Sequence, residues 1–488
     1  MRTFLVAILL SLGLSGCGAH TMYHRGSDRD RAATGAYLRG LMMERSANFP
    51  EALDSYHAAL AHDRNSPLLF IREGATYVKI GQMDRALQSF TKALEIDPKH
   101  PDALRWLAML YASQGKLEEA VAAYEQLLPQ EPDDQFVLTT LADLYVLQDH
   151  LPKAVALYER LIMSFGSSSQ LHFNLGVLYG RMGQFDEAIQ ELSRAYELGP
   201  DSLEIRLAMG LTYELHGKPD YAAAHYEDAI RLDPFNPKLY HHAARAHLSA
   251  GQYAEAAADY QSVLDLTPHD LEAITGLVRA WMAQQRFAEA AQLLGKKLSE
   301  LNEPPELYLA LGLVYREAEQ AQESMRAFER AIAKKPDYAQ AHFYLAAQLD
   351  QLDRKREARA SLRRTLEIDH NHSDAMNYLG YLDIDAGENL TEAKSLIEQA
   401  LLLDPDNGAY VDSLGWAYYK MGRLDEAILQ LERAARLLDT DPVIFEHLGD
   451  AYAKRKDDER ARYYWRKALE IDPMLTVVKN KIDGKIRP

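Results

Sequence analysis

The chain has 488 residues, of which 54 are Lys or Arg and 72 are Asp or Glu, so its formal net charge is −18. An acidic balance of this size disfavours nucleic acid and anionic membrane surfaces as the main partner. Hydrophobic residues make up 47% of the chain, which excludes a disordered protein, and the length alone suggests about three domains.

The N-terminal segment, residues 1–16, has the pattern of a secretory signal peptide. A positively charged start at Arg2 is followed by the apolar run Phe4–Leu14 and by two small residues, Ser15 and Gly16. The apolar run is too short to cross a membrane, since a spanning helix needs about 20 residues. We therefore predict that residues 1–16 are a cleaved signal, and they are left out of the fold prediction.

The only cysteine of the chain, Cys17, directly follows this signal. A lone cysteine cannot form an intramolecular disulfide, which is the usual reason for cysteine in an exported protein. The stretch "LSGC" that ends at Cys17 resembles the lipobox of bacterial lipoproteins. The resemblance implies that Cys17 carries lipid and that Gly18 directs the protein to the outer membrane of a Gram-negative cell. The alternative is an incidental thiol after an ordinary signal.

Residues 17–32 lack any repeated pattern and are predicted to form the lipidated N-terminus and a polar tether. From residue 33 to residue 475 the sequence instead repeats with a period of about 34 residues. One column of small residues recurs in thirteen units, with a single inserted residue before the eleventh: Ala52, Ala86, Ala120, Ala154, Ala188, Ala222, Ala256, Ala290, Ser324, Ala358, Ala393, Ala427 and Ala461. A second column, twelve residues earlier, is Gly or Ala in every unit except the one with Val278.

These columns predict a pair of helices in each unit. Small residues on both helices let the two axes approach closely, because side chains at the contact set the distance between helices. An aromatic residue later in many units is expected to fill the space beside this contact: Phe90, Tyr124, Tyr158, Tyr226, Tyr260 and Phe328. Glycine between the helices suits a turn with positive φ, and proline at the end of the unit ends the second helix.

The segment "NLGVLYGRMGQFDEAIQELSRAYELGP" and the period of the repeat resemble the tetratricopeptide repeat. The resemblance implies an all-α, right-handed α-solenoid of about 13 repeats, hence about 26 helices, over residues 33–475. Because no unit can bury its apolar face alone, the repeats are expected to share a continuous core. Residues 476–488 are expected to cap the last pair.

The sequence contains no metalloprotease, nucleotide-binding or serine hydrolase motif. A repeat array also leaves no residues for a separate catalytic domain. We therefore predict that the chain is not an enzyme and has no cofactor, no metal site and no small-molecule substrate.

In tetratricopeptide arrays the first helix of each unit lines a concave groove through its places 2, 5, 9 and 12. Carrying these places over gives two apolar clusters as candidate partner-binding sites. The first contains Phe136, Phe173, Val177, Leu207 and Leu211, and the second contains Tyr381, Ile384, Trp416 and Tyr419. Exposed apolar area usually marks an interaction site, and Trp and Tyr are common anchors, which favours the second cluster. The alternative, favoured for the aliphatic residues, is packing between neighbouring repeats.

The C-terminal block that contains "DSLGWAYYKMGRLDEA" resembles a segment common in bacterial envelope tetratricopeptide proteins. The leading interpretation is a periplasm-facing scaffold on the outer membrane that binds protein partners. It would assist assembly of an envelope complex such as a pilus or secretin, an export system or the outer-membrane biogenesis machinery. Two alternatives are a holdase-like chaperone for unfolded clients and a regulator of cell-wall enzymes. Membrane contact is expected only through the lipid anchor.

Overall fold

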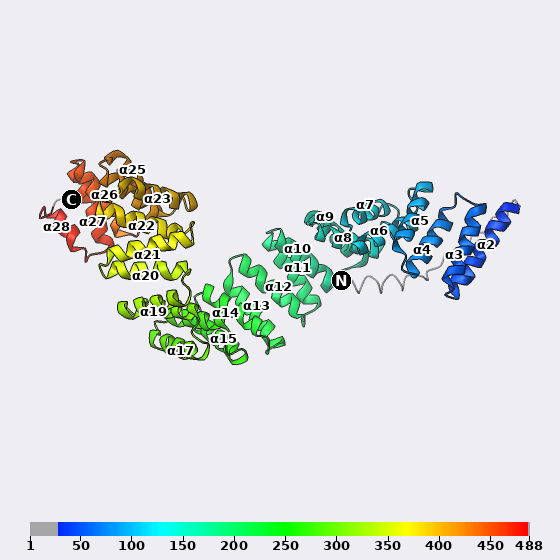
Figure 1. Cartoon of the computed structure of the whole chain (residues 1–488), viewed down its shortest axis with the longest axis horizontal. Coiled ribbons are helices and arrows are strands. Elements are labelled where there is room, and N and C mark those ends of the chain that lie inside the picture. Colours follow the sequence, from blue (N-terminus) through cyan, green and yellow to red (C-terminus); the bar gives the residue numbers. More distant parts are fainter. Residues whose placement is uncertain (1–27, 487–488) are drawn as a thin grey trace. The chain divides into compact units, whose positions relative to one another are not determined.

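The computed structural model describes residues 28–486, and all 27 regular elements in this range are α-helices (Figure 1). The predicted signal at residues 1–16 and the predicted lipid site at Cys17 lie outside the described residues. None of the described helices is both long and apolar enough to cross a membrane. The first helix begins at Asp28, earlier than the predicted start of the array at Ala33.

The contacts divide the chain into two compact units with a boundary at Pro234. In the first unit six helix pairs follow one another: α2 (Asp28–Arg45) with α3 (Phe49–His62), α4 (Pro67–Lys79) with α5 (Met83–Ile96), α6 (Pro101–Gln114) with α7 (Leu117–Leu127), α8 (Gln135–Leu147) with α9 (Leu151–Phe165), α10 (Ser169–Arg181) with α11 (Phe185–Leu198), and α12 (Leu203–Leu215) with α13 (Pro219–Leu232).

The second unit continues the same pattern with seven pairs and one short last helix. Its elements are α14 (Pro237–Ser249) with α15 (Tyr253–Leu266), α16 (Leu271–Ala283) with α17 (Phe287–Glu300), α18 (Pro305–Glu317) with α19 (Ala321–Lys334), α20 (Ala339–Gln351) with α21 (Lys355–Ile368), α22 (Ser373–Ala386) with α23 (Leu390–Leu403), α24 (Gly408–Lys420) with α25 (Leu424–Leu437), α26 (Pro442–Lys454) with α27 (Asp458–Ile471), and α28 (Thr476–Ile482). The predicted all-α class and the predicted helix pairs are confirmed.

The small residues of the first predicted column lie at the contact between the two helices of each pair. All thirteen are fully buried. Ser324, the one member that is not alanine, donates its hydroxyl hydrogen to the carbonyl oxygen of Gly312 at 2.8 Å, so its polar group is satisfied. At Gly210 an added Cβ would lie 2.5 Å from the ring of Tyr226. The second column is therefore small because a side chain from a neighbouring second helix occupies the space, an aromatic ring at Gly210 and the aliphatic side chains of Leu192 and Leu431 at Gly176 and Gly415.

Turns between the helices also follow the sequence pattern. Gly115 and Gly183 have φ angles of 75° and 74°, in the left-handed region that glycine adopts without steric cost. At the start of α8 a carboxylate oxygen of Asp134 accepts a hydrogen bond from the backbone N–H of Val137 at 3.0 Å. This bond satisfies one of the N–H groups that the first turn of a helix leaves without a partner.

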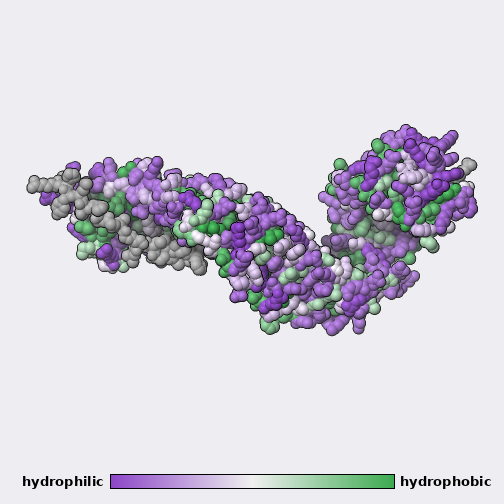
Figure 2. Space-filling model, turned by 180° about the vertical axis from the view of Figure 1, so that it is seen from behind, coloured by the Kyte–Doolittle hydropathy of each residue, from purple (hydrophilic) through white to green (hydrophobic). Residues whose placement is uncertain are grey.

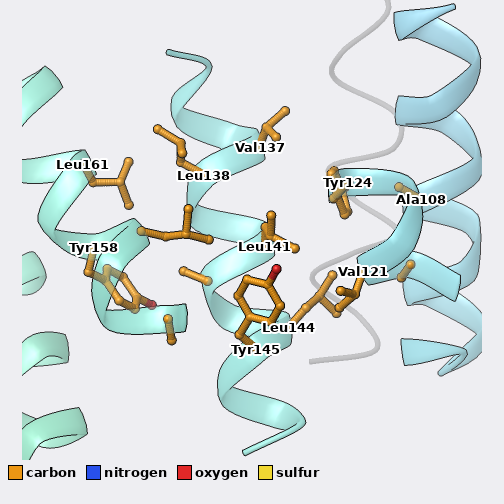
Figure 3. Packing of buried hydrophobic residues seen from close by; sticks show 14 of the residues in the cluster. Ala108, Val121, Tyr124, Val137, Leu138, Leu141, Leu144, Tyr145, Tyr158 and Leu161 are labelled. Atoms are coloured by element: carbon orange, nitrogen blue, oxygen red, sulfur yellow. The ribbon is translucent and has the colours of Figure 1, made fainter. Parts of the chain in front are cut away.

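The best-developed core of the first unit surrounds α8. Its side chains Val137, Leu138 and Leu141 are fully buried, and they pack with residues of α6, α7, α9 and α10 (Figure 3). The second unit ends with α28, which packs on α27 and buries Val478. In each unit, neighbouring repeats together form the hydrophobic core, as expected for a solenoid.

Candidate functional site

A cavity of about 640 Å³ lies beside α8 in the first unit. Most of its lining is apolar and includes Met109, Phe136, Val146, Leu147, Phe173 and Val177. We call this cavity the α8 groove. Its volume lies within the range of about 300–1,000 Å³ that is usual for binding pockets. Three residues of the first predicted cluster, Phe136, Phe173 and Val177, line it together.

The groove exists because neighbouring first helices stand apart here. Helix α8 packs on the second helices α7 and α9, whereas it has little direct contact with the first helices α6 and α10. In the second unit, by contrast, the first helix α22 packs directly on the next first helix, α24. The spacing of first helices therefore decides where the concave face is open.

One repeat position beside the α8 groove carries alanine where the sixth repeat has glutamate. In α12, Glu214 accepts a hydrogen bond at 2.8 Å from the hydroxyl of Tyr226, which lies twelve residues later. The corresponding residues in the third repeat are Ala112 and Tyr124, and both line the groove. Because alanine cannot replace the carboxylate, the buried hydroxyl of Tyr124 makes no hydrogen bond within the described part of the chain.

Apolar side chains continue from the groove along the first unit. Val177 in α10 is 37% exposed, and Leu211, at the same repeat position in α12, is 43% exposed. Leu207 is half-buried, and Leu147 beside the groove is exposed. Elsewhere the face in Figure 2 shows hydrophobic patches separated by hydrophilic residues. The first predicted cluster thus forms a partly exposed apolar surface on neighbouring helices, α8, α10 and α12.

Two charged side chains line the groove, Asp143 and Arg181. Asp143 is exposed, and its Oδ1 accepts a hydrogen bond from the hydroxyl of Tyr158 at 2.6 Å. Burial raises the pKa of Tyr158, and the bond to Asp143 raises it further, so the tyrosine keeps its proton and acts as the donor. Arg181 forms an ion pair with Asp149 at 2.8 Å. Asp143 was not among the predicted site residues, although the same repeat numbering puts it at place 9 of its helix.

The second predicted cluster has a different environment. Trp416 is only 8% exposed, and Ile384 and Tyr419 are buried as well. The Trp416 ring stacks on the Tyr419 ring at 4.5 Å between centroids and on the His447 ring at 4.0 Å. The apolar area that the sequence predicted to be exposed here is therefore covered by the chain itself, because α22, α24 and α26 pack directly on one another.

Tyr381, the fourth member of this cluster, is half-buried. Burial raises its pKa to about 12, with a smaller effect from the nearby carboxylate of Asp385. Partner binding by the second cluster stays a prediction, whereas the first cluster offers apolar surface without any rearrangement.

A buried group of charges lies next to Trp416. The Nδ1 atom of His447 is 3.0 Å from both carboxylate oxygens of Asp412. Close by, Nζ of Lys481 lies 2.6 Å from Glu446 and 2.7 Å from Asp450. These contacts join α24, α26 and α28, and the sequence pattern gave no sign of them because the partners are 31 to 35 residues apart.

A solenoid of helix pairs with an apolar groove on its first helices defines a class of helical-repeat proteins that act as protein-interaction scaffolds. Family models for the tetratricopeptide repeat match residues 77–137, 139–202, 173–237, 225–258, 247–312, 309–373, 379–442 and 442–474. These matches cover most of the chain between residues 77 and 474. The chain therefore belongs to the tetratricopeptide repeat proteins.

Two curated relatives share part of this array. The chain is 27% identical over 164 residues to the TPR repeat-containing protein PA4667 of Pseudomonas aeruginosa, a match that covers 33% of this chain and 27% of the relative. It is also 27% identical over 161 residues to the protein O-mannosyl-transferase Tmtc3 of Drosophila melanogaster, covering 33% of this chain and 17% of the relative. The match thus spans less than a third of either relative.

Two solved structures match the chain at low sequence identity. A chain of the APC/C hetero-tetramer Cut9-Hcn1 matches with a TM-score of 0.44 and 14% identity, covering 95% of this chain and 97% of that one. A chain of the Naa15/Naa10 complex bound to HypK-THB matches with a TM-score of 0.45 and 16% identity, covering 89% and 68%.

Proposed function

We propose that this protein is a scaffold that binds an apolar segment of a partner protein in the α8 groove. The observation that carries the proposal is the open apolar cavity of about 640 Å³, lined by Phe136, Phe173 and Val177. A concave, mostly apolar cavity with a few polar groups is the usual form of a binding site. The continuation of the surface to Leu211 suits a protein segment, which is longer than a small molecule.

Val177→Asp is expected to weaken binding of such a segment by about thirtyfold, the loss typical of a central interface contact. The substitution puts a charge into an apolar contact, where it would lose hydration without gaining a partner. Folding should change little, because Val177 is already 37% exposed. The measurement is fluorescence polarisation with 12-residue peptides selected on the full-length chain from a random library.

Leu402→Asp is the matched control, because Leu402 is an exposed aliphatic residue of α23 in the other unit. It should leave peptide affinity unchanged. Equal binding of the selected peptides to wild type and to Val177→Asp would contradict the groove as the binding site. Selected peptides with a shared pattern support a scaffold, whereas apolar peptides without any pattern would support the holdase alternative.

We further propose that this scaffold is anchored by lipid at Cys17 on the periplasmic side of the outer membrane and assists assembly of an envelope complex. The support for the anchor is the sequence: a short apolar segment, small residues and a single cysteine directly after them. Several acyl chains would hold the protein durably, because one chain alone binds a membrane only marginally.

Cys17→Ser is expected to move the protein from the membrane fraction to the soluble fraction. Wild type should take up labelled palmitate in growing cells, and the variant should not. Loss of both membrane association and palmitate uptake in Cys17→Ser supports the lipid anchor. A wild-type protein that takes up no label, combined with a variant that still sediments with membranes, would contradict it.

A further inference from the structure

Asp143 is the one acidic side chain that lines the α8 groove within the described residues. It lines the same cavity as the apolar residues Phe136 and Val177, and it is exposed to solvent. The hydroxyl of Tyr158, at 2.6 Å, holds its Oδ1 atom and so fixes the direction of the carboxylate. This arrangement leaves the second oxygen, Oδ2, available to a ligand in the groove.

The basic side chain of the lining already has a carboxylate partner. Arg181, the one basic residue of the lining, pairs with Asp149 at 2.8 Å. Across residues 28–486 no ion pair is formed by Asp143 itself. The lining therefore carries one carboxylate that forms no ion pair, Asp143, and one guanidinium, Arg181, that is paired with Asp149.

A carboxylate beside an apolar wall favours a ligand that supplies both apolar surface and positive charge. Because Asp143 is exposed, a charge pair formed there contributes modestly to affinity and weakens on adding salt. The net charge of −18 also attracts a basic segment over a distance and accelerates its encounter with the groove. A ligand with its own carboxylate would instead meet repulsion from Asp143.

We propose that the α8 groove selects a protein segment in which an apolar side chain fills the cavity and an adjacent Lys or Arg pairs with Asp143. This selectivity rests on the proposed function, because it names the chemistry of the segment that the scaffold binds. The apolar side chain and the basic side chain come from one short stretch of the partner, because Asp143, Phe136 and Val177 line the same cavity.

The test uses the peptides selected on the full-length chain from a random 12-residue library. The selected peptides are expected to contain Lys or Arg next to an apolar residue. Asp143→Asn should lower their affinity by about two- to fivefold, as expected for an exposed charge pair, and should reduce the loss of affinity on adding salt. The asparagine keeps a carbonyl oxygen that accepts the Tyr158 hydrogen bond, so the fold is preserved.

A double-mutant cycle separates direct pairing from a change in overall charge. In each peptide the Lys or Arg is replaced by Gln, and both peptides are titrated against wild type and Asp143→Asn. The replacement should weaken binding to wild type and have little effect on the variant. The matched control is Asp54→Asn, which removes one exposed carboxylate from α3 and should leave the selected peptides' affinity almost unchanged.

Two results would overturn the proposed selectivity: selected peptides without Lys or Arg, or equal affinity for wild type and Asp143→Asn. If Val177→Asp abolishes binding while Asp143→Asn does not, the scaffold stands and the charge selectivity fails. If neither substitution changes binding, or if the library yields no binding peptide, both proposals fail.

Discussion

Ala188→Trp is expected to separate α10 from α11 and to unfold this part of the first unit before the rest of the chain. Ala188 is fully buried at the contact between the two helices, and a Cβ added to Gly176 on α10 would lie 3.2 Å from its carbonyl oxygen. Adding even small groups to such a contact costs about 1–3 kcal/mol, and an indole ring adds far more volume. The effect should stay local, because each repeat is stabilised mainly by its neighbours.

Hydrogen exchange followed by mass spectrometry measures whether the loss of stability stays near the substituted repeat. Exchange should become faster in residues 169–232, which form α10 to α13, and should change little beyond Ala393. Gln190→Trp is the control, because Gln190 lies on the more exposed side of α11 and has room for the ring. Faster exchange over both units to the same extent would contradict a stack of nearest-neighbour repeats.

Removal of the His447 side chain is expected to produce the largest loss of stability in the second unit. His447 and Asp412 are both buried and lie 3.0 Å apart, so His447→Ala would leave a buried carboxylate without its partner. Breaking a buried ion pair in this way costs about 3–5 kcal/mol. The stacked Trp416 ring, 4.0 Å from the imidazole, would also lose part of its packing.

The contribution of His447 should depend on pH in a defined direction. Burial by itself lowers the pKa of His447, but the adjacent Asp412 carboxylate more than offsets this, and the pKa lies above its ordinary value of 6.5. Asp450 and Glu446, which lie on the same helix as His447, also raise its pKa. Lys481 of α28 forms an ion pair with each of these two carboxylates. A raised pKa means that the folded state binds the proton more tightly than the unfolded state does.

The stabilisation by protonated His447 is therefore fully present below about pH 6.5 and is lost as the pH rises through the raised folded-state pKa. Denaturant unfolding followed by tryptophan fluorescence checks this, because Trp416 and Trp465 both lie in the second unit. The difference in stability between wild type and His447→Gln should shrink between about pH 6 and about pH 9. A difference that is constant over this range would refute an ionised His447.

The helix pairs could be predicted from the sequence because their determinants are local and repeated. A fully buried small residue such as Ala222 and an aromatic partner such as Tyr226 lie within one repeat unit, so a single period reveals both. Turn glycines such as Gly115 act within a few residues, and their left-handed φ follows from the missing Cβ. The same numbering placed Phe136, Phe173 and Val177 in one predicted cluster, and these three residues line the α8 groove.

The sequence by itself thus determined the fold class and which residues face the groove side of each first helix. Only the tertiary structure decided whether that side is open. The repeat numbering gives Val177 and Trp416 the same place, yet Val177 is 37% exposed and Trp416 is 8% exposed. The physical reason is that Trp416 is covered by a side chain from another repeat, which a pattern within one repeat does not reveal. The His447 ring of α26, 31 residues after Trp416, stacks on the indole at 4.0 Å between centroids, whereas Val177 lines the open α8 groove.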